Sequence, residues 1–87
     1  MAKILVADDE VQLTDLLAEI VAEHGHEAFR AYNGRDALLL AKREIPDLII
    51  ADVMMPHMSG FELFRAIRAE HSLNNTRIVL ISAAFTI

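Results

Sequence analysis

Polar side chains that can bind a metal or take part in phosphoryl chemistry follow three short apolar segments of the sequence. Asp8 and Asp9 come directly after the first of these segments, Asp52 after the second, and Ser82 after the third. A short continuous apolar run rich in branched residues is typical of a parallel strand that is buried on both faces. Open parallel sheets bind ligands at the carboxyl ends of their strands, so we expect these four side chains to converge there.

Three carboxylates in one pocket repel one another, and a cation is the usual compensation. The set offers oxygen ligands and neither His nor Cys, which suits Mg²⁺. A carboxylate beside Mg²⁺ can attack a phosphoryl group and form an aspartyl phosphate, while the metal neutralises charge on the transferred oxygens. The hydroxyl of Ser82 can donate a hydrogen bond to one of those oxygens. The sequence therefore predicts a magnesium site with phosphoryl chemistry.

Strand-like and helix-like apolar patterns alternate along the chain. Strands are expected at residues 3–7, 27–31, 48–51 and 78–81, and helices at residues 10–24, 35–44 and 58–71. This alternation is typical of an α/β fold in which right-handed crossovers join the strands of a mostly parallel sheet. The fourth strand, like the first, is expected to be buried. Gly25 is expected to close the first helix, and Asn33 to cap the second.

Each expected helix carries apolar residues, and in the first and third helices they mark one side. In the first helix they recur at the spacing of an amphipathic helix, at Leu13, Leu16, Leu17, Ile20 and Val21. In the second helix they are Ala37, Leu38, Leu39, Leu40 and Ala41. In the third helix they are Phe61, Leu63, Phe64 and Ile67.

Length and composition are those of one compact domain. Of the 87 residues 54% are hydrophobic, and only three are Gly and two Pro, which excludes intrinsic disorder. The 8 basic and 13 acidic residues give a formal net charge of −5, and the basic ones are scattered, so we expect no direct nucleic-acid binding. The absence of cysteine fits a cytoplasmic location. No apolar run approaches the roughly 20 residues of a membrane span.

Taken together, these motifs resemble the receiver domain of two-component response regulators. The resemblance runs from Lys3 to Ser82 and rests on four segments: ILVADDE at 4–10, PDLIIADVMMP at 46–56, MSGFEL at 58–63 and IVLISA at 78–83. It implies a flavodoxin-like (CheY-like) three-layer α/β fold, with a parallel sheet in the order 2-1-3-4. Ser59 stands where an Asp is common in the family, at a helix start that tolerates either residue.

The resemblance also implies residue roles and partners. Asp52 is then the phosphoacceptor, Asp8 and Asp9 hold Mg²⁺ directly or through water, Met54 adds its backbone carbonyl, and Ser82 is the switch hydroxyl. The phosphoryl group comes from a sensor histidine kinase or a small phosphodonor, and phosphorylation regulates protein–protein interaction. The domain is accordingly expected to signal rather than to act as an enzyme, apart from self-catalysed phosphoryl transfer to Asp52.

The family pattern stops after the fourth expected strand. The family's fourth helix, fifth strand and fifth helix have no counterpart here, nor has the Lys that the fifth strand brings to the phosphoryl group. We therefore expect a single truncated receiver domain over residues 1–87. Two interpretations stay open at this point. One is a phosphoacceptor signalling domain, and the other is a receiver-derived fragment that acts only as a folding or self-assembly module.

An uncovered fourth strand predicts self-association, because an apolar edge strand is an aggregation hazard unless it is paired. We expect a homo-oligomer, most simply a two-fold dimer, in which residues 78–87 of two chains cover each other and Phe85 and Ile87 add apolar contacts.

The remaining candidate residues have simpler interpretations. We expect His24, His26, His57 and His71 at the surface or in loops rather than in a zinc site. The methionines near Asp52 are expected to serve packing. Met54 also stands where phosphatases of the haloacid dehalogenase type need an acid, which disfavours that enzyme class.

Overall fold

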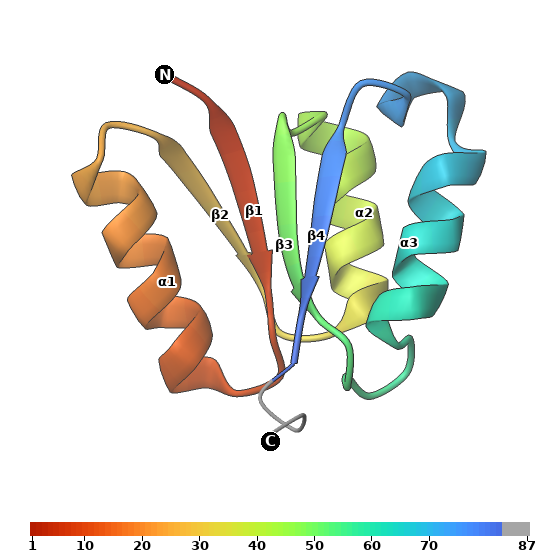
Figure 1. The fold of residues 1–87 in the computed structure, drawn as a ribbon, viewed down its shortest axis with the longest axis horizontal. Coiled ribbons are helices and arrows are strands. Elements are labelled where there is room, and N and C mark those ends of the chain that lie inside the picture. Colours follow the sequence, from red (N-terminus) through yellow and green to blue (C-terminus); the bar gives the residue numbers. More distant parts are fainter. Residues whose placement is uncertain (83–87) are drawn as a thin grey trace.

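The computed structural model describes residues 1–82 and places a four-stranded parallel sheet between two layers of helices (Figure 1). The strands lie in the order β2-β1-β3-β4, and all three pairings are parallel. The elements in chain order are β1 (Lys3–Ala7), α1 (Val11–Glu23), β2 (Glu27–Ala31), α2 (Gly34–Glu44), β3 (Leu48–Asp52), α3 (Gly60–Ala69), a 3₁₀ helix (His71–Leu73) and β4 (Arg77–Ile81). The predicted α/β fold and strand order are confirmed.

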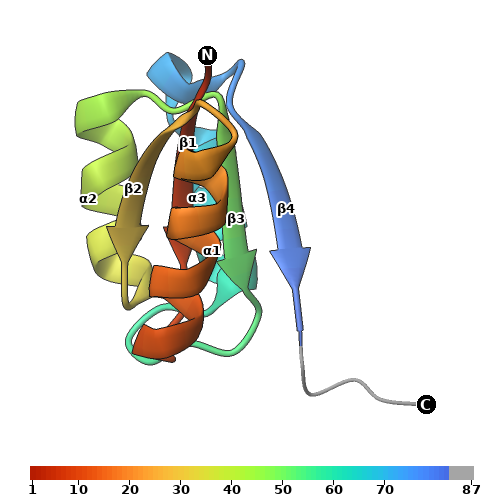
Figure 2. The same ribbon diagram turned by 90° about the vertical axis from the view of Figure 1, so that its left-hand side faces the viewer.

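Helices α2 and α3 cover one face of the sheet, and α1 lies on the other (Figures 1 and 2). Side chains alternate between the two faces along a strand. The face under α2 and α3 holds the main core, to which the strands contribute Leu5, Ala7, Ala31, Ile49 and Ala51. The helices contribute Ala37, Ala41, Leu63 and Ile67, all fully buried.

The buried side of α1 differs from the predicted one. The residues that α1 buries completely are Thr14 and Ala18, while Leu16 is 52% and Ile20 42% exposed. Asp15 accepts hydrogen bonds from the Arg30 guanidinium at 3.0 Å and the Tyr32 hydroxyl at 2.7 Å, which holds α1 over β2. The prediction was wrong for Leu16 and Ile20 because no described element packs against that flank of the helix.

Helix α3 and strand β4 are also less covered than predicted. Phe61 and Phe64 are 54% and 40% exposed, and within α3 the close packing falls on Leu63 and Ile67 instead. In β4 Val79 is 49% exposed. The expectation that the fourth strand is buried like the first was therefore wrong, whereas the expectation of an uncovered apolar strand agrees with this exposure. The physical reason is that, among residues 1–82, β4 lies at the edge of the sheet and pairs only with β3.

Local capping sets the helix ends. The Asn33 side chain accepts a hydrogen bond from the Asp36 N–H at 2.8 Å, which confirms the predicted cap of α2. Ser59 and Glu62 form a reciprocal capping box, so α3 begins at Gly60 rather than at residue 58. It ends at Ala69, two residues before the predicted end.

Candidate functional site

Three carboxylates meet at the carboxyl end of the sheet. Asp8, Asp9 and Asp52 each place one oxygen within 4.8 Å of those of the other two. Strands β1 and β3 are neighbours, and the last residue of β1, Ala7, pairs with Ala51. The acids that follow these two residues therefore lie side by side, and the predicted convergence of the three side chains is confirmed.

Hydrogen bonds from neighbouring elements hold Asp8 in place. Its side chain is only 4% exposed, and its Oδ1 accepts a hydrogen bond from the Glu10 N–H at 2.9 Å. The hydroxyl of buried Thr14 donates to the Asp8 backbone carbonyl at 2.7 Å. Thr14 was missed in the sequence because a Thr among the polar positions of an amphipathic helix gives no sign of a tertiary contact. Its one available signal is the spacing of four from Ala18, which marks a small-residue face.

The environment favours the protonated forms of two of the three acids. Burial raises the pKa of Asp8, and repulsion from Asp52 and Asp9 adds to this, against the hydrogen bond from Glu10. Burial likewise raises the pKa of Asp52, with repulsion from Asp9 in the same direction and backbone hydrogen bonds from Val53 and Met54 opposing it.

No basic side chain within residues 1–82 forms an ion pair with this cluster. The two lysines pair elsewhere, Lys3 with Glu44 at 3.6 Å and Lys42 with Glu70 at 3.4 Å. A crowded set of carboxylate oxygens without a protein cation fits a small divalent cation with oxygen ligands, such as Mg²⁺.

Gly60 fixes the loop that leaves Asp52. Its N–H donates to the Val53 carbonyl at 2.9 Å. A Cβ at this position would lie 2.4 Å from the Asp52 carbonyl oxygen, well inside contact distance. The first turn of α3 can therefore lie against the end of β3 only with Gly here. The sequence marked Gly60 as a helix start and gave no sign of this approach.

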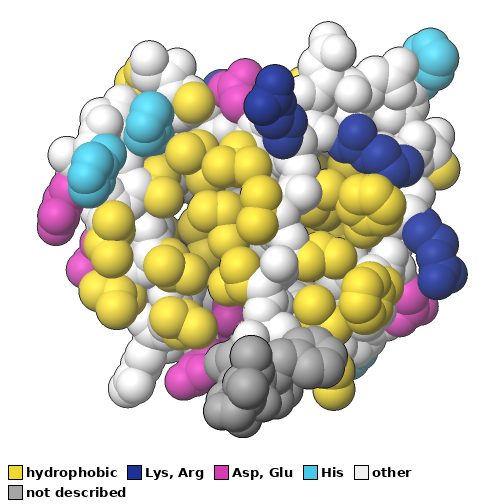
Figure 3. All heavy atoms as spheres, viewed as in Figure 1, with side chains coloured by type: hydrophobic (Ala, Val, Ile, Leu, Met, Phe, Trp, Pro, Cys, Tyr) yellow, Lys and Arg dark blue, Asp and Glu magenta, His cyan; other side chains and the backbone are white. Residues whose placement is uncertain are grey.

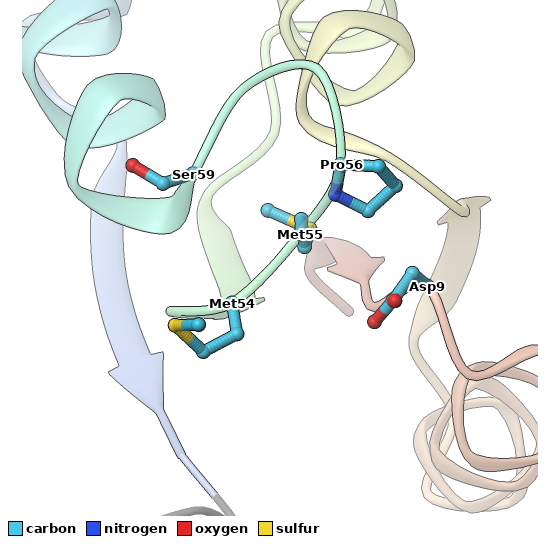
Figure 4. A pocket seen from close by; sticks show the side chains of 5 residues that line it. All are labelled: Asp9, Met54, Met55, Pro56 and Ser59. Carbon is cyan, nitrogen blue, oxygen red and sulfur yellow. The ribbon is translucent and has the colours of Figure 1, made fainter.

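A pocket of about 360 Å³ opens beside the cluster (Figure 4). It is lined by Asp9, Met54, Met55, Pro56 and Ser59, so one wall carries a carboxylate of the cluster and the rest is mainly apolar. The Met54 side chain is 65% exposed. The metal-binding role of its backbone carbonyl stays a prediction.

Ser82 follows the last residue of β4, and that residue, Ile81, pairs with Asp52. Ser82 is half-buried and lies at the same carboxyl end of the sheet as the three acids. The four predicted positions thus lie at the carboxyl end of the sheet. The switch role of Ser82 stays a prediction.

None of the four histidines belongs to this group of possible metal ligands. His24, His57 and His71 are exposed, and the half-buried His26 accepts the Ala2 N–H on its Nδ1 at 3.0 Å.

Comparison with known proteins identifies the family. The model of the response regulator receiver domain matches residues 4–86. The chain belongs to this family. The protein PilH of Pseudomonas aeruginosa is 30% identical over 82 residues, which cover 94% of this chain and 68% of PilH. Response regulator PleD of Caulobacter vibrioides is 41% identical over 83 residues, or 94% of this chain and 18% of PleD.

Solved receiver structures share the fold. The chemotaxis response regulator CheY4 of Vibrio cholerae superimposes with a TM-score of 0.92 at 34% identity, over 99% of this chain and 72% of that one. The Francisella response regulator 1452 receiver domain gives a TM-score of 0.87 at 30% identity, over 99% and 69%. Among residues 1–82, no helix has the length and apolar character needed to cross a membrane. By family, the chain is a two-component receiver, which is a signalling domain.

Proposed function

We propose that Asp52 accepts a phosphoryl group in a Mg²⁺-dependent reaction and that this phosphorylation regulates protein–protein interaction. The observation that carries the proposal is the set of three carboxylates within 4.8 Å of one another in a receiver-family chain. Burial divides their roles. Asp8 is 4% exposed, which suits a metal ligand on the buried side of the site. Asp52 is half-buried and ends its strand, which suits a residue that a phosphodonor must reach.

Asp8, Asp9 and the backbone carbonyl of Met54 would hold the metal together with Asp52. Bound Mg²⁺ supplies neutralising charge for the oxygens of the transferred phosphoryl group. The family's acidic pocket has its counterpart in the cluster described above.

In the transfer step a carboxylate oxygen of Asp52 attacks phosphorus, and the bond between phosphorus and the leaving group of the donor breaks. The electron pair of that bond stays with the leaving group, which is acetate when the donor is acetyl phosphate. The product is an acyl phosphate on Asp52, so no oxidant or reductant is needed. The Ser82 hydroxyl donates to a phosphoryl oxygen in this proposal. The donor is a sensor histidine kinase or a small phosphodonor, and the setting is the cytoplasm.

Intact-mass spectrometry after incubation with acetyl phosphate and Mg²⁺ tests the acceptor. We expect the parent protein to gain the mass of one phosphoryl group and Asp52→Asn to gain none. Asp47→Asn is the matched control, because exposed Asp47 precedes β3 at the opposite end of the same strand. Equal labelling of the parent and Asp52→Asn contradicts the assignment of Asp52.

Binding of beryllofluoride with Mg²⁺ separates this proposal from the alternative of a fragment that only folds or self-assembles. Beryllofluoride mimics the aspartyl phosphate, so a phosphoacceptor site binds it and Asp52→Asn does not. A folded parent that binds neither beryllofluoride nor Mg²⁺ favours the alternative.

We also propose that β4 pairs with β4 of a second copy. The Arg77 N–H and the Ile81 carbonyl bond toward β3. In a parallel ladder this alternation turns the backbone groups of Ile78 and Leu80 outward, to the open edge. The contacts expected from Phe85 and Ile87 lie outside the described residues. Light scattering on Val79→Lys against the parent tests this self-association, and a folded parent that stays monomeric contradicts it.

A further inference from the structure

The loop between β3 and α3, residues 53–59, lies against the start of α2 (Figure 1). Gly34, the first residue of α2, is buried. A Cβ added there would lie 2.2 Å from the Met58 carbonyl oxygen and 2.7 Å from the Met58 Cβ, whereas ordinary van der Waals contact begins at 3.4 Å. Only a residue without a side chain therefore lets α2 and the backbone of Met58 approach this closely.

The same loop carries backbone groups of the acidic site. The N–H groups of Val53 and Met54 donate hydrogen bonds to the Asp52 carboxylate, and in the proposed function the Met54 carbonyl is a metal ligand. In Figure 3, acidic side chains are visible at the lower end of the molecule, while the Lys and Arg side chains of this view lie at the top and on the right. A cation that balances the acids thus depends on ligands that the loop places.

A stiff turn joins these two parts of the loop. The Met58 N–H donates to the Pro56 carbonyl at 2.7 Å, and His57 between them has a φ of 69°. This is a γ-turn of the form with positive φ, which is strained for a residue with a side chain. The ring of Pro56 fixes its own φ and restricts the residue before it, Met55. Few backbone torsions between Met58 and Met54 are therefore free to absorb a shift.

Helix α2 is the more firmly held partner of this contact. Its residues Ala37 and Ala41 are fully buried in the main core. In the loop, Pro56 and His57 are exposed. A Cβ at Gly34 would therefore displace the loop rather than the helix, and a shift of about 1 Å is needed to restore contact distance.

We propose that Gly34 is a positioning residue for phosphorylation: it seats Met58 against α2, and the stiff turn passes this constraint on to the Met54 carbonyl. The inference rests on the proposed function. Gly34 has no side chain that could bind a ligand or carry a proton, so its role is to position and not to catalyse. Gly60 holds the other end of the loop, through its bond to the Val53 carbonyl.

Calorimetric titration with Mg²⁺ tests the proposal without relying on phosphorylation. Groups that orient metal ligands typically change metal affinity by 10–100-fold, so we expect the dissociation constant of Mg²⁺ to rise about tenfold in Gly34→Ala. Asn33→Ala is the matched control, because it removes the cap at the same end of α2 and adds no atom against the loop. It should bind Mg²⁺ like the parent. A folded Gly34→Ala protein with the parent's affinity overturns the proposal.

The kinetics of labelling by acetyl phosphate provide a second readout. At saturating Mg²⁺ we expect kcat to fall about tenfold in Gly34→Ala and KM for acetyl phosphate to change by less than about twofold. Partial unfolding alone would lower the labelled fraction and leave KM and the Mg²⁺ affinity of the folded protein unchanged. If the parent neither binds Mg²⁺ nor becomes labelled, the proposed function fails and this inference fails with it. If the parent does both and Gly34→Ala matches it, this inference alone is overturned.

The variant His57→Gly tests the turn and does not depend on the folding of Gly34→Ala. Glycine adopts a positive φ without strain, so the turn loosens while stability stays close to that of the parent. We expect Mg²⁺ to bind several-fold more weakly, and Gly34→Ala to have a smaller effect in this background. His57→Ala keeps a Cβ and the strained φ, so its affinity should lie nearer to that of the parent. Parent-like Mg²⁺ affinity in His57→Gly overturns the proposal.

Discussion

The two faces of the sheet are built from alternate residues of the same strands, yet they differ in burial and chemistry. On the side of α2 and α3, Leu5, Ala7, Ile49 and Ala51 are at most 1% exposed and all are apolar. On the side of α1, Ile4 and Val6 of β1 are buried as well. The alternating positions on this side end in Asp8 after β1 and Asp52 in β3, and the apolar residues of β3 and β4 that face it are only partly buried. One face therefore carries most of the packing, and the other carries the acids.

The comparison teaches that a receiver sheet separates stability from function by the two-residue period of its strands. The alternation is clearest in β3, where buried positions alternate with partly buried ones that lead to Asp52. Each prediction below tests that separation.

The largest effect is expected from neighbouring residues of β3. Ile49 is fully buried, at 0% exposure, so Ile49→Ala removes packed methyl groups and leaves a cavity. We expect it to lower the free energy of unfolding by about 2–5 kcal/mol. Ile50→Ala, on the side of α1, should cost less than half as much. Urea unfolding of both variants measures this difference. Equal losses contradict the separation.

Metal binding at the acidic cluster should stabilise the folded protein. Mg²⁺ at a hundred times its dissociation constant should raise the free energy of unfolding by about 2.7 kcal/mol. Asp8→Asn removes one of the crowded charges, so we expect a higher melting temperature without metal and the loss of most of the Mg²⁺ response. Thermal unfolding with and without Mg²⁺ measures both. If the melting temperature of the parent does not change with Mg²⁺, the cluster holds no metal.

Gly60 joins the two sides, because it brings α3 of the packed face against the backbone of Asp52. Gly60→Ala places a methyl group 2.4 Å from the Asp52 carbonyl oxygen, so the loop must move. We expect a loss of about 1–3 kcal/mol in stability together with slower phosphorylation of Asp52. Gly25→Ala is the control: Gly25 has a φ of 86° and no neighbour within 4 Å of an added Cβ. It should lower stability while leaving the phosphorylation rate of the folded protein unchanged.

The sequence predicts the sheet well because each strand combines a branched apolar run with a polar stop. All four strands lie within one residue of their predicted bounds. The convergence of the acids could be predicted for the same reason, since the carboxyl ends of parallel strands lie at the same end of the sheet. The predicted fold and the convergence of Asp8, Asp9 and Asp52 therefore depend on local patterns that the tertiary structure does not override.

The burial of helix side chains was harder to predict. Period alone identifies apolar positions, but the approach of α1 to the sheet is set by small residues, Thr14 and Ala18, while Leu16 remains outside. The contacts of Thr14 with Asp8 and of Gly60 with Asp52 are likewise tertiary. No spacing in the sequence distinguishes them from an ordinary helical Thr and a helix-start Gly.

The smallest effect we predict is a pH dependence of stability in the metal-free protein. The pKa values of Asp8 and Asp52 are raised above the ordinary 3.8, mainly by burial. As pH rises past 3.8 the unfolded chain loses these protons first, so the folded state binds more protons and the free energy of unfolding falls with pH until the raised pKa values are passed. Other acids add their own pH dependence, and the difference between the parent and Asp8→Asn isolates the cluster. As the pH rises above 3.8, the parent should lose stability relative to Asp8→Asn until the raised pKa values are passed, as followed by urea unfolding. A difference that stays constant or grows in favour of the parent means that the Asp8 carboxylate is compensated within the protein, and the acidic side would then need no metal.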